Sequence, residues 1–414
     1  MITIAAATEE ILANIKPLGL ERVNLFASLG RVLGEDVLAG RDIPPKNNSA
    51  MDGYAVHWQD TAGASAEHVV ILEVIEDIPA GAIPQRSILS GQAARIMTGA
   101  PLPDGADAIV KMEDTEKDGR RVKIKAAVPA GQDIRYAGED VRAGELVIPK
   151  GSIIRPAGIG MLASLGRSFV SVCQRPLVAV LATGDELVDI DETPSPWKII
   201  NSNSYSLAAL AMDCGASIMQ MGIARDKRED LIAKFQSAMR ADIIISSGGV
   251  SVGDYDLVKD IMQEVGSRMQ FWQVAMRPGK PLAYGRIGNV PLFGLPGNPV
   301  SSMISFEEFV RPAILKMMGH RNLFRKMVPA ILKEDVEKRK GLTHFIRASV
   351  TAGTEGYIAS TTGEQGSGIL KSMVRANGLI VLPADDTVLV KAGTKVKVQL
   401  LDNSLASTAS PEFL

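Results

Sequence analysis

Residues 177–187 read LVAVLATGDEL, and residues 241–256 read ADIIISSGGVSVGDYD. Each stretch begins with a continuous apolar run, as in a strand that is buried on both faces of a sheet. Each run is followed by glycine and then by acidic residues. From residue 174 to about residue 320 such runs alternate with helical patterns, which predicts an open, mostly parallel α/β sheet.

Neighbouring segments complete this α/β pattern. Further strands are expected at ASIMQMGIA (216–224) and in PLFGL (291–295). Asn201 or Asn203 is the expected cap of a helix that ends at Gly215. Further helices are expected over residues 226–240, 252–266 and 299–319, because their apolar residues recur at helical spacing.

The flanking segments have a different character. Residues 1–40 read as helical, with Thr8 as the expected N-cap, and Pro44 and Pro45 break the pattern. Short strand-like runs separated by Gly and Pro then follow to about residue 150, and a helical pattern returns at 151–166. The strand-like segment is therefore expected to be a β domain inserted into a helical N-terminal unit. Residues 321–402 predict a small β barrel, and the polar tail that follows is expected to fray.

Composition narrows the function classes. A chain of 414 residues with 46% hydrophobic and 22% charged residues is typical of a globular protein of two to four domains. The 45 basic and 47 acidic side chains give a net charge of −2, which argues against non-specific nucleic-acid binding. Cys173 and Cys214 form no C-x-x-C pair, so a disulfide framework or a thiolate zinc site is not expected. No signal peptide or apolar run of about 20 residues is seen, so a cytoplasmic location is expected.

Candidate binding residues follow the predicted parallel strands, because ligands bind outside the carboxyl ends of such strands. Glycine lets backbone amides approach an anion, and the next helix adds its positive N-terminal dipole. Carboxylates beside such a phosphate pocket suit Mg²⁺. The residues concerned are Thr183, Gly184, Asp185, Glu186, Asp226, Ser247, Gly248, Gly249, Asp254, Asp256, Pro296, Gly297 and Asn298.

Basic residues complement these acids. Arg277 and Lys280 lie three positions apart in MRPGKP (276–281), and Arg347 lies in THFIRAS (343–349). Ser367 lies between two glycines in TTGEQGSG (361–368). Arg, Lys and Ser are the donors that a tetrahedral oxyanion requires, although loop charges of this kind are usually only solvated.

Other readings stay open at this point. Gly-rich turns often serve only to reverse the chain, and isolated acids often cap helices. Gly249–Gly253 fits the G-x-S-x-G motif of serine hydrolases, with Ser251 as nucleophile and only His320 or His344 downstream as base. A P-loop motif is absent, and no G-x-G-x-x-G opens the first βα unit, which argues against the common nucleotide folds.

An ordered series of motifs resembles the molybdopterin molybdenumtransferase family, MoeA, whose animal relative is the E domain of gephyrin. The series runs from about residue 8 to residue 400 and comprises NSAMDGYA (48–55), RIMTGAPLP (95–103), AGED (137–140), ATGDEL (182–187), SSGGVSVGDYD (246–256), MRPGKP (276–281), GLPGNPVS (294–301) and TTGEQGSG (361–368). Each motif is weak alone, and the set is specific. ATGDEL and SSGGVS also resemble the smaller molybdopterin adenylyltransferases, from which NSAMDGYA, PGNPVS and the C-terminal barrel distinguish the longer family.

The resemblance implies a subunit of four parts. An elongated helical unit comprises residues 1–42 and 141–173, and the inserted β domain comprises residues 43–140. The molybdopterin-binding α/β domain comprises residues 174–320, the C-terminal β barrel comprises 321–402, and residues 403–414 form the tail. Family members are homodimers whose active site is shared between subunits, and transient contact with other proteins of molybdenum-cofactor biosynthesis is expected. No nucleic-acid or membrane partner is expected.

The resemblance also implies a reaction and a set of site residues. The reaction joins molybdate to adenylylated molybdopterin and releases AMP, with assistance from Mg²⁺. Asp52, Thr98, Asp140, Glu186 and Asp226 fall on functional positions, of which Asp52, Thr98, Glu186 and Asp226 are expected to be catalytic. Molybdate is expected to bind Arg277, Lys280, Ser301, Arg347 and Ser367, and Mg²⁺ to bind Glu186, Asp226 and Asp256. The pterin nucleotide is expected at Thr183, Gly184, Asp185, Ser247, Gly248, Gly249, Pro296, Gly297 and Asn298. The alternative to this enzymatic function is a scaffold that binds molybdopterin without catalysis.

Overall fold

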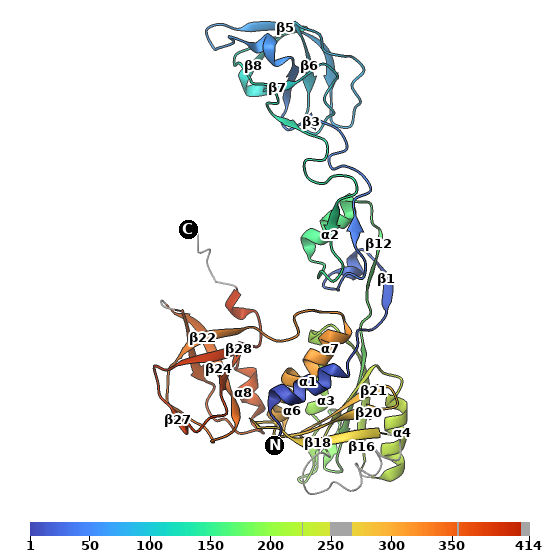
Figure 1. The fold of residues 1–414 in the computed structure, drawn as a ribbon, viewed down its shortest axis with the longest axis vertical. Helices are drawn as coiled ribbons and strands as arrows, with labels where there is room; N and C mark the ends of the chain where they lie inside the picture. Colours follow the sequence, from blue (N-terminus) through green and yellow to red (C-terminus); the bar gives the residue numbers. More distant parts are fainter. Residues whose placement is uncertain (226, 249–266, 354–355, 407–414) are drawn as a thin grey trace. The chain divides into compact units, whose positions relative to one another are not determined.

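The computed structural model describes residues 1–225, 227–248, 267–353 and 356–406 (Figure 1). The chain divides into two compact units, which are described separately. One unit consists of Met1–Arg22 and Ser171–Leu414, and the other consists of Val23–Val170. Strands β1 (Leu20–Asn24) and β12 (Phe169–Cys173) carry the chain from one unit to the other.

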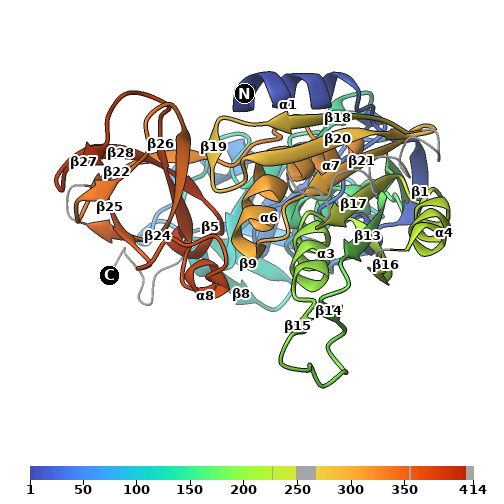
Figure 2. The same cartoon turned by 90° about the horizontal axis from the view of Figure 1, so that it is seen from below.

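A six-stranded sheet forms the centre of the first unit, in the order β16-β13-β17-β21-β20-β18 (Figure 2). The first four strands are parallel, and β20 and β18 continue the sheet antiparallel. Their bounds are Ser217–Ala224 (β16), Leu177–Thr183 (β13), Ile243–Ser247 (β17), Val290–Leu295 (β21), Pro281–Ile287 (β20) and Ser267–Gln273 (β18). The predicted open, mostly parallel sheet is confirmed.

Helices cover both faces of this sheet, which explains why β13 is apolar throughout. Val178 and Val180 belong to the core that includes α1, α3, α6 and α7, whereas Ala179 and Leu181 belong to the core that includes α4. Alternate residues of a strand point to opposite faces, so a strand covered on both sides requires apolar residues at every position. The helices are Ile4–Ala13 (α1), Asn203–Asp213 (α3), Arg228–Ala238 (α4), Pro299–Ser305 (α6) and Arg311–Met317 (α7), and a π-helical turn, Phe306–Val310, joins α6 to α7.

The C-terminal strands close into a barrel in the order β24-β25-β22-β28-β26, with β26 pairing back to β24. This closure confirms the predicted small C-terminal barrel. Strand β19 (Met276–Arg277) runs parallel to the start of β24, so the MRPGKP segment lies against the barrel. The other elements are Met327–Leu332 (β22), Thr343–Gly353 (β24), Gly356–Thr361 (β25), Gly378–Leu382 (β26), Lys395–Leu400 (β28), Val336–Glu337 (β23), Leu389–Val390 (β27), Leu370–Val374 (α8) and the short helix Ser404–Ala406.

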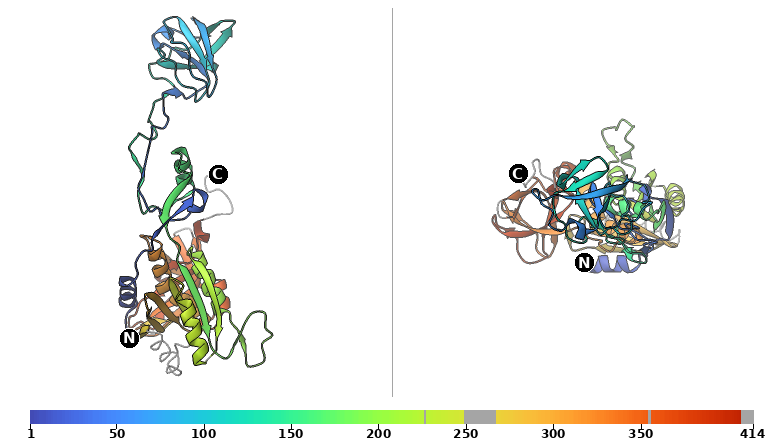
Figure 3. Two further views of the ribbon diagram at one scale, coloured as in Figure 1. Left: turned by 90° about the vertical axis from the view of Figure 1, so that its right-hand side faces the viewer. Right: turned by 90° about the horizontal axis from the view of Figure 1, so that it is seen from above.

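A second six-stranded sheet dominates the Val23–Val170 unit, in the order β7-β4-β6-β5-β9-β8. Its strands, coloured blue to cyan in Figure 3, have apolar cores on both faces, with Tyr54 in one core and Ala55 in the other. The strands are Gly53–Val56 (β4), Val70–Ile78 (β5), Gln92–Ile96 (β6), Ala108–Lys111 (β7), Thr115–Asp118 (β8) and Arg121–Ile124 (β9), with short helices at Trp58–Thr61 and Met112–Asp114.

The sequence predicted helical segments before and after this β domain along the chain, and these segments contain less helix than the pattern suggested. Helix α1 begins at Ile4 because the Thr3 hydroxyl accepts the Ala6 amide at 3.2 Å, so the expectation that Thr8 is the N-cap was wrong. Residues 141–173 contain one helix, α2 (Pro156–Ser164). Frequent Gly and Pro favour short paired strands elsewhere: Val37–Leu38 (β2), Asn48–Ser49 (β3), Ile134–Arg135 (β10) and Leu146–Ile148 (β11), with a short helix at Phe26–Ser28. Among the described residues, no helix is long and apolar enough to cross a membrane.

A buried ion pair stabilises the π-helical turn. Glu307, whose side chain is 2% exposed, accepts two hydrogen bonds from Arg325, at 2.8 and 3.0 Å. We expect Glu307→Gln to reduce the free energy of unfolding by about 3 kcal/mol, because it removes the buried counter-ion of Arg325 and leaves only the exposed Asp213, 4.0 Å away. Urea unfolding of the full chain measures the change.

The matched control is the exposed pair Lys391–Asp335, in which the side chains are 68% and 46% exposed. Lys391→Gln should cost less than about 1 kcal/mol. Equal losses in the two variants would contradict the difference between the buried and the exposed pair.

Candidate functional site

The carboxyl ends of β13, β17 and β21 enclose a small cavity of about 80 Å³, here called the sheet-edge pocket. Helix α3 and the short parallel strands β14 (Leu187–Val188) and β15 (Ile199–Ile200) complete its wall. The lining residues are Ala182, Thr183, Glu186, Leu187, Ile199, Ile200, Asn201, Ser202, Asn203, Ser247, Gly248, Gly297 and Pro299. The structure therefore brings Thr183, Glu186, Ser247, Gly248 and Gly297 together, as the strand-end argument predicted.

Glycine is required at Gly248, where the turns of this pocket meet. Gly248 has φ +92°, and a Cβ atom there would lie 2.6 Å from the Thr183 carbonyl oxygen. A Cβ atom at Gly297 would lie 3.8 Å from the Cα atom of Gly248, so two turns approach each other through bare backbone. This close approach leaves main-chain atoms, rather than side chains, exposed to a ligand at the strand ends.

Two buried oxygen atoms in the pocket lack a hydrogen-bond partner among the described residues, Thr183 Oγ1 and Asn203 Oδ1. The amide nitrogen of Asn203 is fixed, since it donates to Ser247 Oγ and to the Gly297 carbonyl, both at 2.8 Å. Buried polar atoms in proteins are nearly always hydrogen-bonded, so these two oxygens are candidate contacts for an ordered water or a ligand. The sequence had suggested Asn203 only as a helix cap. It is Asn201 Oδ1 that accepts the Ser204 amide at 3.2 Å.

The acidic part of the predicted site is only partly described. Glu186 is exposed at the pocket, and a Cβ atom at Gly184 would lie 2.4 Å from its Oε2 atom. Asp185 is also exposed, and its carbonyl oxygen accepts a hydrogen bond from Lys198. Asp226, Gly249, Ser251, Asp254 and Asp256 lie outside the described residues. Within the described ranges no group of three His, Cys, Asp or Glu side chains could hold a metal. The predicted Mg²⁺ ligands and the Ser251 nucleophile therefore stay predictions, since most of these residues lie outside the described ranges.

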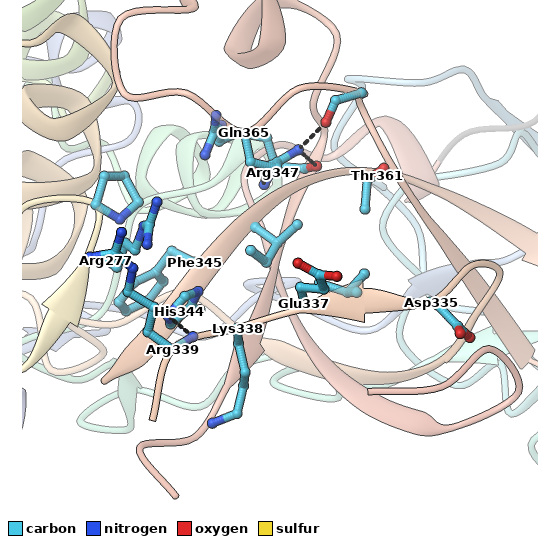
Figure 4. Close-up of a pocket in the computed structure, with 14 residues that line it drawn as sticks. Arg277, Asp335, Glu337, Lys338, Arg339, His344, Phe345, Arg347, Thr361 and Gln365 are labelled. Atoms are coloured by element: carbon cyan, nitrogen blue, oxygen red, sulfur yellow. Dashed lines mark hydrogen bonds between the residues drawn. The ribbon is translucent and has the colours of Figure 1, made fainter. Parts of the chain in front are cut away.

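A larger cavity of about 500 Å³ lies between the MRPGKP segment and the barrel, and is here called the barrel pocket (Figure 4). It brings together two predicted residues that are far apart in sequence, Arg277 and Arg347. The pocket is lined by Arg277, Pro278, Asp335, Val336, Glu337, Lys338, Arg339, His344, Phe345, Ile346, Arg347, Thr361, Gly363 and Gln365.

Arg347 is the most unusual cation of this pocket because it is only 1% exposed and pairs with no carboxylate among the described residues. Its Nε atom donates to Ser372 Oγ at 3.0 Å, and Nη2 donates to the Gly366 carbonyl at 2.9 Å. Burial lowers the pKa of the guanidinium to about 10, so it remains charged at neutral pH. A buried cation held only by neutral acceptors favours the binding of an anion.

Gln365 fixes the main chain at Arg347 from both sides. The Arg347 amide donates to Gln365 Oε1 at 2.9 Å, and Gln365 Nε2 donates back to the Arg347 carbonyl at 3.2 Å. Neither Gln365 nor Ser372 was identified from the sequence. Gln365 stands two residues before Ser367 in a quoted motif, whereas no sequence signal pointed to Ser372.

His344 supplies a neutral polar group to the barrel pocket. Burial, with smaller effects of Arg277, Lys338 and Arg339, lowers the pKa of the imidazole to about 4. Its Nε2 atom accepts the Arg339 amide at 3.0 Å, so the ring proton of the neutral form resides on Nδ1. The charge of Lys338 is offset by Asp385, 2.7 Å away.

The first turn of α6 connects the two pockets. Pro299 lines the sheet-edge pocket, and the adjacent Val300 amide donates to the Ser367 carbonyl at 3.0 Å. Ser301 follows in the same turn, so the predicted Ser301 and Ser367 belong to neighbouring segments. The MRPGK turn also packs on this helix, because a Cβ atom at Gly279 (φ +98°) would lie 2.7 Å from Ser305 Oγ. Lys280 is exposed and does not line the barrel pocket, and Pro296 and Asn298 flank Gly297 without lining the sheet-edge pocket.

Asp52 and Thr98 lie together in the Val23–Val170 unit. Asp52 Oδ1 accepts hydrogen bonds from the amide and the hydroxyl of Thr98, both at 2.7 Å. The Thr98 amide and then its hydroxyl lower the pKa of the exposed Asp52 carboxyl below its ordinary value. Asp52 therefore orders its own loop, whatever further role it has. Asp140 is exposed, and its amide donates to the Ile43 carbonyl at 3.1 Å.

Comparison with known proteins covers nearly the whole chain. Residues 2–166 match the MoeA N-terminal region (domain I and II), residues 179–316 match a probable molybdopterin binding domain, and residues 329–401 match the MoeA C-terminal region (domain IV). The chain is similar to molybdopterin molybdenumtransferase from Staphylococcus epidermidis, with 37% identity over 92% of this chain and 91% of the relative. It is also similar to molybdopterin molybdenumtransferase 2 from Mycobacterium tuberculosis, with 40% identity over 91% and 94% of the two chains.

A solved structure supports the same relationship. The molybdopterin biosynthesis moeA protein from Pyrococcus horikoshii OT3 superposes with a TM-score of 0.82 and 31% identity. The match covers 97% of this chain and 100% of that chain.

The low pKa of His344 leads to a test by pH. The unfolded chain takes up this proton near pH 6.5 and the folded chain only near pH 4, so stability should fall as the pH drops through this interval. His344→Gln should make the decrease shallower. In NMR spectra of the ¹³C-labelled protein, the His344 ring should show no titration above pH 5, and a midpoint above pH 6 would contradict the neutral assignment.

Proposed function

The chain belongs to the molybdopterin molybdenumtransferase (MoeA) family, and we propose that it inserts molybdate into adenylylated molybdopterin, with release of AMP. The observation that carries this proposal is the continuity of two chemically different pockets through one turn of helix. From Pro299 the path runs through the Val300–Ser367 hydrogen bond to Gly366, whose carbonyl binds Arg347. A substrate with a nucleotide at one end and a metal-accepting group further along could occupy both pockets.

In this proposal the sheet-edge pocket binds the nucleotide end of the substrate. The turns at Ser247–Gly249 and Pro296–Asn298 supply backbone amides, and the helix N-termini add their positive dipoles. Thr183 ends β13, Gly184 and Asp185 follow it in the turn, and all three are assigned to the same nucleotide site. The unpartnered Thr183 Oγ1 and Asn203 Oδ1 support this assignment, because a bound ligand or its water shell would satisfy them.

The barrel pocket and the adjoining first turn of α6 bind molybdate. Arg347 and Arg277 provide charge, Lys280 adds a further cation, and Ser301 and Ser367 provide hydroxyl donors. The buried Arg347 supports this role most strongly, since its charge has no counter-ion among the described residues. Fixed cations beside the scissile phosphate bond would stabilise the charge that develops as AMP leaves.

Mg²⁺ is assigned to Glu186, with Asp226 and Asp256 as further ligands. The described residues fit this ion, because the side chains of Glu186, Thr183 and Asn203 all offer oxygen atoms at one pocket. Oxygen atoms are the ligands that Mg²⁺ prefers. When bound, Mg²⁺ would neutralise phosphate charge. Glu186 would supply a carboxylate ligand to the ion, while the amides of the strand-end turns would bind the phosphate whose charge the ion neutralises.

The proposal includes a homodimer with shared active sites. Large apolar side chains of the Val23–Val170 unit are exposed outside its six-stranded sheet, among them Phe26 (83%), Leu38 (50%), Leu146 (49%) and Phe169 (51%). Leu38 and Leu146 lie opposite each other in the β2–β11 pair, and contiguous exposed apolar surface is typical of an interface between chains. Residues 1–42 and 141–173 would form this elongated interface unit. Each site would then combine Asp52 and Thr98 of one subunit with Glu186 of its partner. A cytoplasmic location and transient contact with other cofactor-biosynthesis proteins stay predictions from the sequence.

Arg347→Ala tests the division between the two pockets. It should raise the molybdate concentration for half-maximal AMP release by about tenfold or more, because a charge-assisted hydrogen bond is lost. Ser367→Ala should act in the same direction with a smaller effect. AMP binding, measured by calorimetry, should stay unchanged in both variants.

Arg375→Ala is the matched control, since Arg375 is an exposed arginine of the same barrel outside the pocket. Equal loss of molybdate use and AMP binding in Arg347→Ala would contradict the assignment of molybdate and the nucleotide to separate pockets. If the wild-type protein binds both substrates and releases no AMP, it is a binding scaffold and the proposed reaction is wrong.

A mixing experiment tests the shared site. Asp52→Ala and Glu186→Ala should each abolish AMP release. In a mixed dimer one site carries both lesions and the other carries neither, and random mixing makes half of all dimers mixed, so about a quarter of all sites should regain activity.

The two variants carry different tags and are unfolded and refolded together, so that mixed dimers can be counted. Each variant refolded alone is the control. Confirmed mixed dimers without recovered AMP release would show that Asp52 acts only within its own chain, where it orders the Thr98 loop.

A further inference from the structure

The barrel pocket has more room than molybdate requires. Its volume of about 500 Å³ lies in the range of roughly 300–1,000 Å³ that is typical of pockets for whole organic ligands. The wall formed by Val336–Arg339 is not used by the oxyanion site proposed above. The Val336–Arg339 wall therefore leaves room for a ligand group beyond the oxyanion.

Glu337 is the unused acceptor at this end. Its carboxylate lines the pocket and forms no ion pair or hydrogen bond with any other residue in the described ranges. The nearby Asp335 differs, because its two oxygen atoms bind the Ala392 amide and Lys391 Nζ, both at 2.8 Å. The main chain of Glu337 is held in strand β23 by pairing with Leu389, and its exposed side chain is free to meet a ligand in the pocket.

The charges around Glu337 show what it can bind. Arg277, Arg339 and Arg347 have no carboxylate partner among the described residues, and Lys338 is paired with Asp385. These guanidinium groups attract anions, whereas the Glu337 carboxylate repels them and accepts hydrogen bonds from N–H groups. The pocket thus favours a ligand with an anionic end and a separate edge of N–H donors.

We infer that Glu337 binds the aminopyrimidinone edge of the pterin ring of the substrate. This edge presents the 2-amino group and the adjacent ring N–H side by side, which matches the two oxygens of a carboxylate, as a guanidinium does. The inference rests on the proposed function and adds a subsite for the pterin ring. It makes Glu337 a determinant of specificity rather than a ligand of molybdate.

The order of the groups along the substrate supports this assignment. In adenylylated molybdopterin the adenylate is joined through pyrophosphate to the carbon skeleton that bears the dithiolene, and the pterin ring lies beyond it. Along the chain of contacts, the sheet-edge pocket is followed by the Val300–Ser367 contact, then by Arg347, and Glu337 lines the same pocket as Arg347. A nucleotide in the first pocket and a dithiolene near Arg347 therefore leave the Glu337 wall for the pterin ring.

Binding of free pterin and of lumazine tests the inference. Lumazine has a carbonyl oxygen in place of the 2-amino group, so it presents an acceptor to Glu337 instead of a donor. Each compound is titrated with the full-length protein and followed by its own fluorescence. The wild-type protein should prefer pterin to lumazine by about tenfold or more, and Glu337→Gln should remove most of this preference.

Glu364→Gln is the matched control, because Glu364 is an exposed glutamate of the same barrel outside the pocket lining, and it should keep the wild-type preference. Glu337→Gln should bind molybdate at least as tightly as the wild type, since it removes a negative charge. Thermal unfolding checks that both variants are folded.

The outcomes separate this inference from the proposed function. An unchanged pterin preference in folded Glu337→Gln, or no preference in the wild-type protein, overturns the pterin subsite even if AMP release is normal. A preference that depends on Glu337 in a protein that releases no AMP supports the subsite and contradicts the proposed reaction.

Discussion

The hydrogen bond from the Val300 amide to the Ser367 carbonyl is the contact on which the candidate site depends. The first amides of a helix have no partner within the helix, and Asn298, the N-cap of α6, makes no side-chain capping bond. A barrel loop supplies the missing acceptor instead. The first turn of α6 and the loop containing Gly366 and Ser367 are therefore held together. This contact places the pocket at the sheet edge next to the pocket at the barrel.

Arg347 requires a second constraint, because burial of a guanidinium without a counter-ion is unfavourable. Ser372, the Gly366 carbonyl and the two-sided contact with Gln365 hold the side chain and its main chain in place. None of these partners cancels the positive charge. The fold therefore maintains a cation without a counter-ion among the described residues, and binding of the proposed oxyanion would recover part of the stability lost by burial.

The sequence predicted the scaffold better than the details of the site. The apolar run at Leu177–Thr183 became β13 because a strand covered on both faces has a distinctive pattern, and two of the glycines that follow the strands, Gly248 and Gly297, line the predicted pocket. Thr8 failed as a helix cap because caps depend on a single local hydrogen bond, which Thr3 makes. Asn203 and Gln365 act through contacts with residues 44 and 18 positions away, respectively, which local patterns do not reveal. Ser372 could not be predicted from local sequence for the same reason, since its contact with Arg347 spans 25 positions.

The two pockets offer different groups to a ligand, backbone in one and charged side chains in the other. This difference suits the proposed reaction, in which two unlike substrates meet. The sheet-edge pocket relies on bare backbone at Gly248 and Gly297, and a Cβ atom at Gly248 would lie 2.6 Å from the Thr183 carbonyl oxygen. The barrel pocket relies on charged side chains carried by strands that are closed into a barrel. In the proposed reaction, amides would bind the phosphate that leaves as part of AMP, whereas fixed guanidinium groups would stabilise the charge of the oxyanion. Both sets of groups are already in place in the fold, so the proposed reaction would need little reorganisation, and the connection through α6 would keep the reacting groups close.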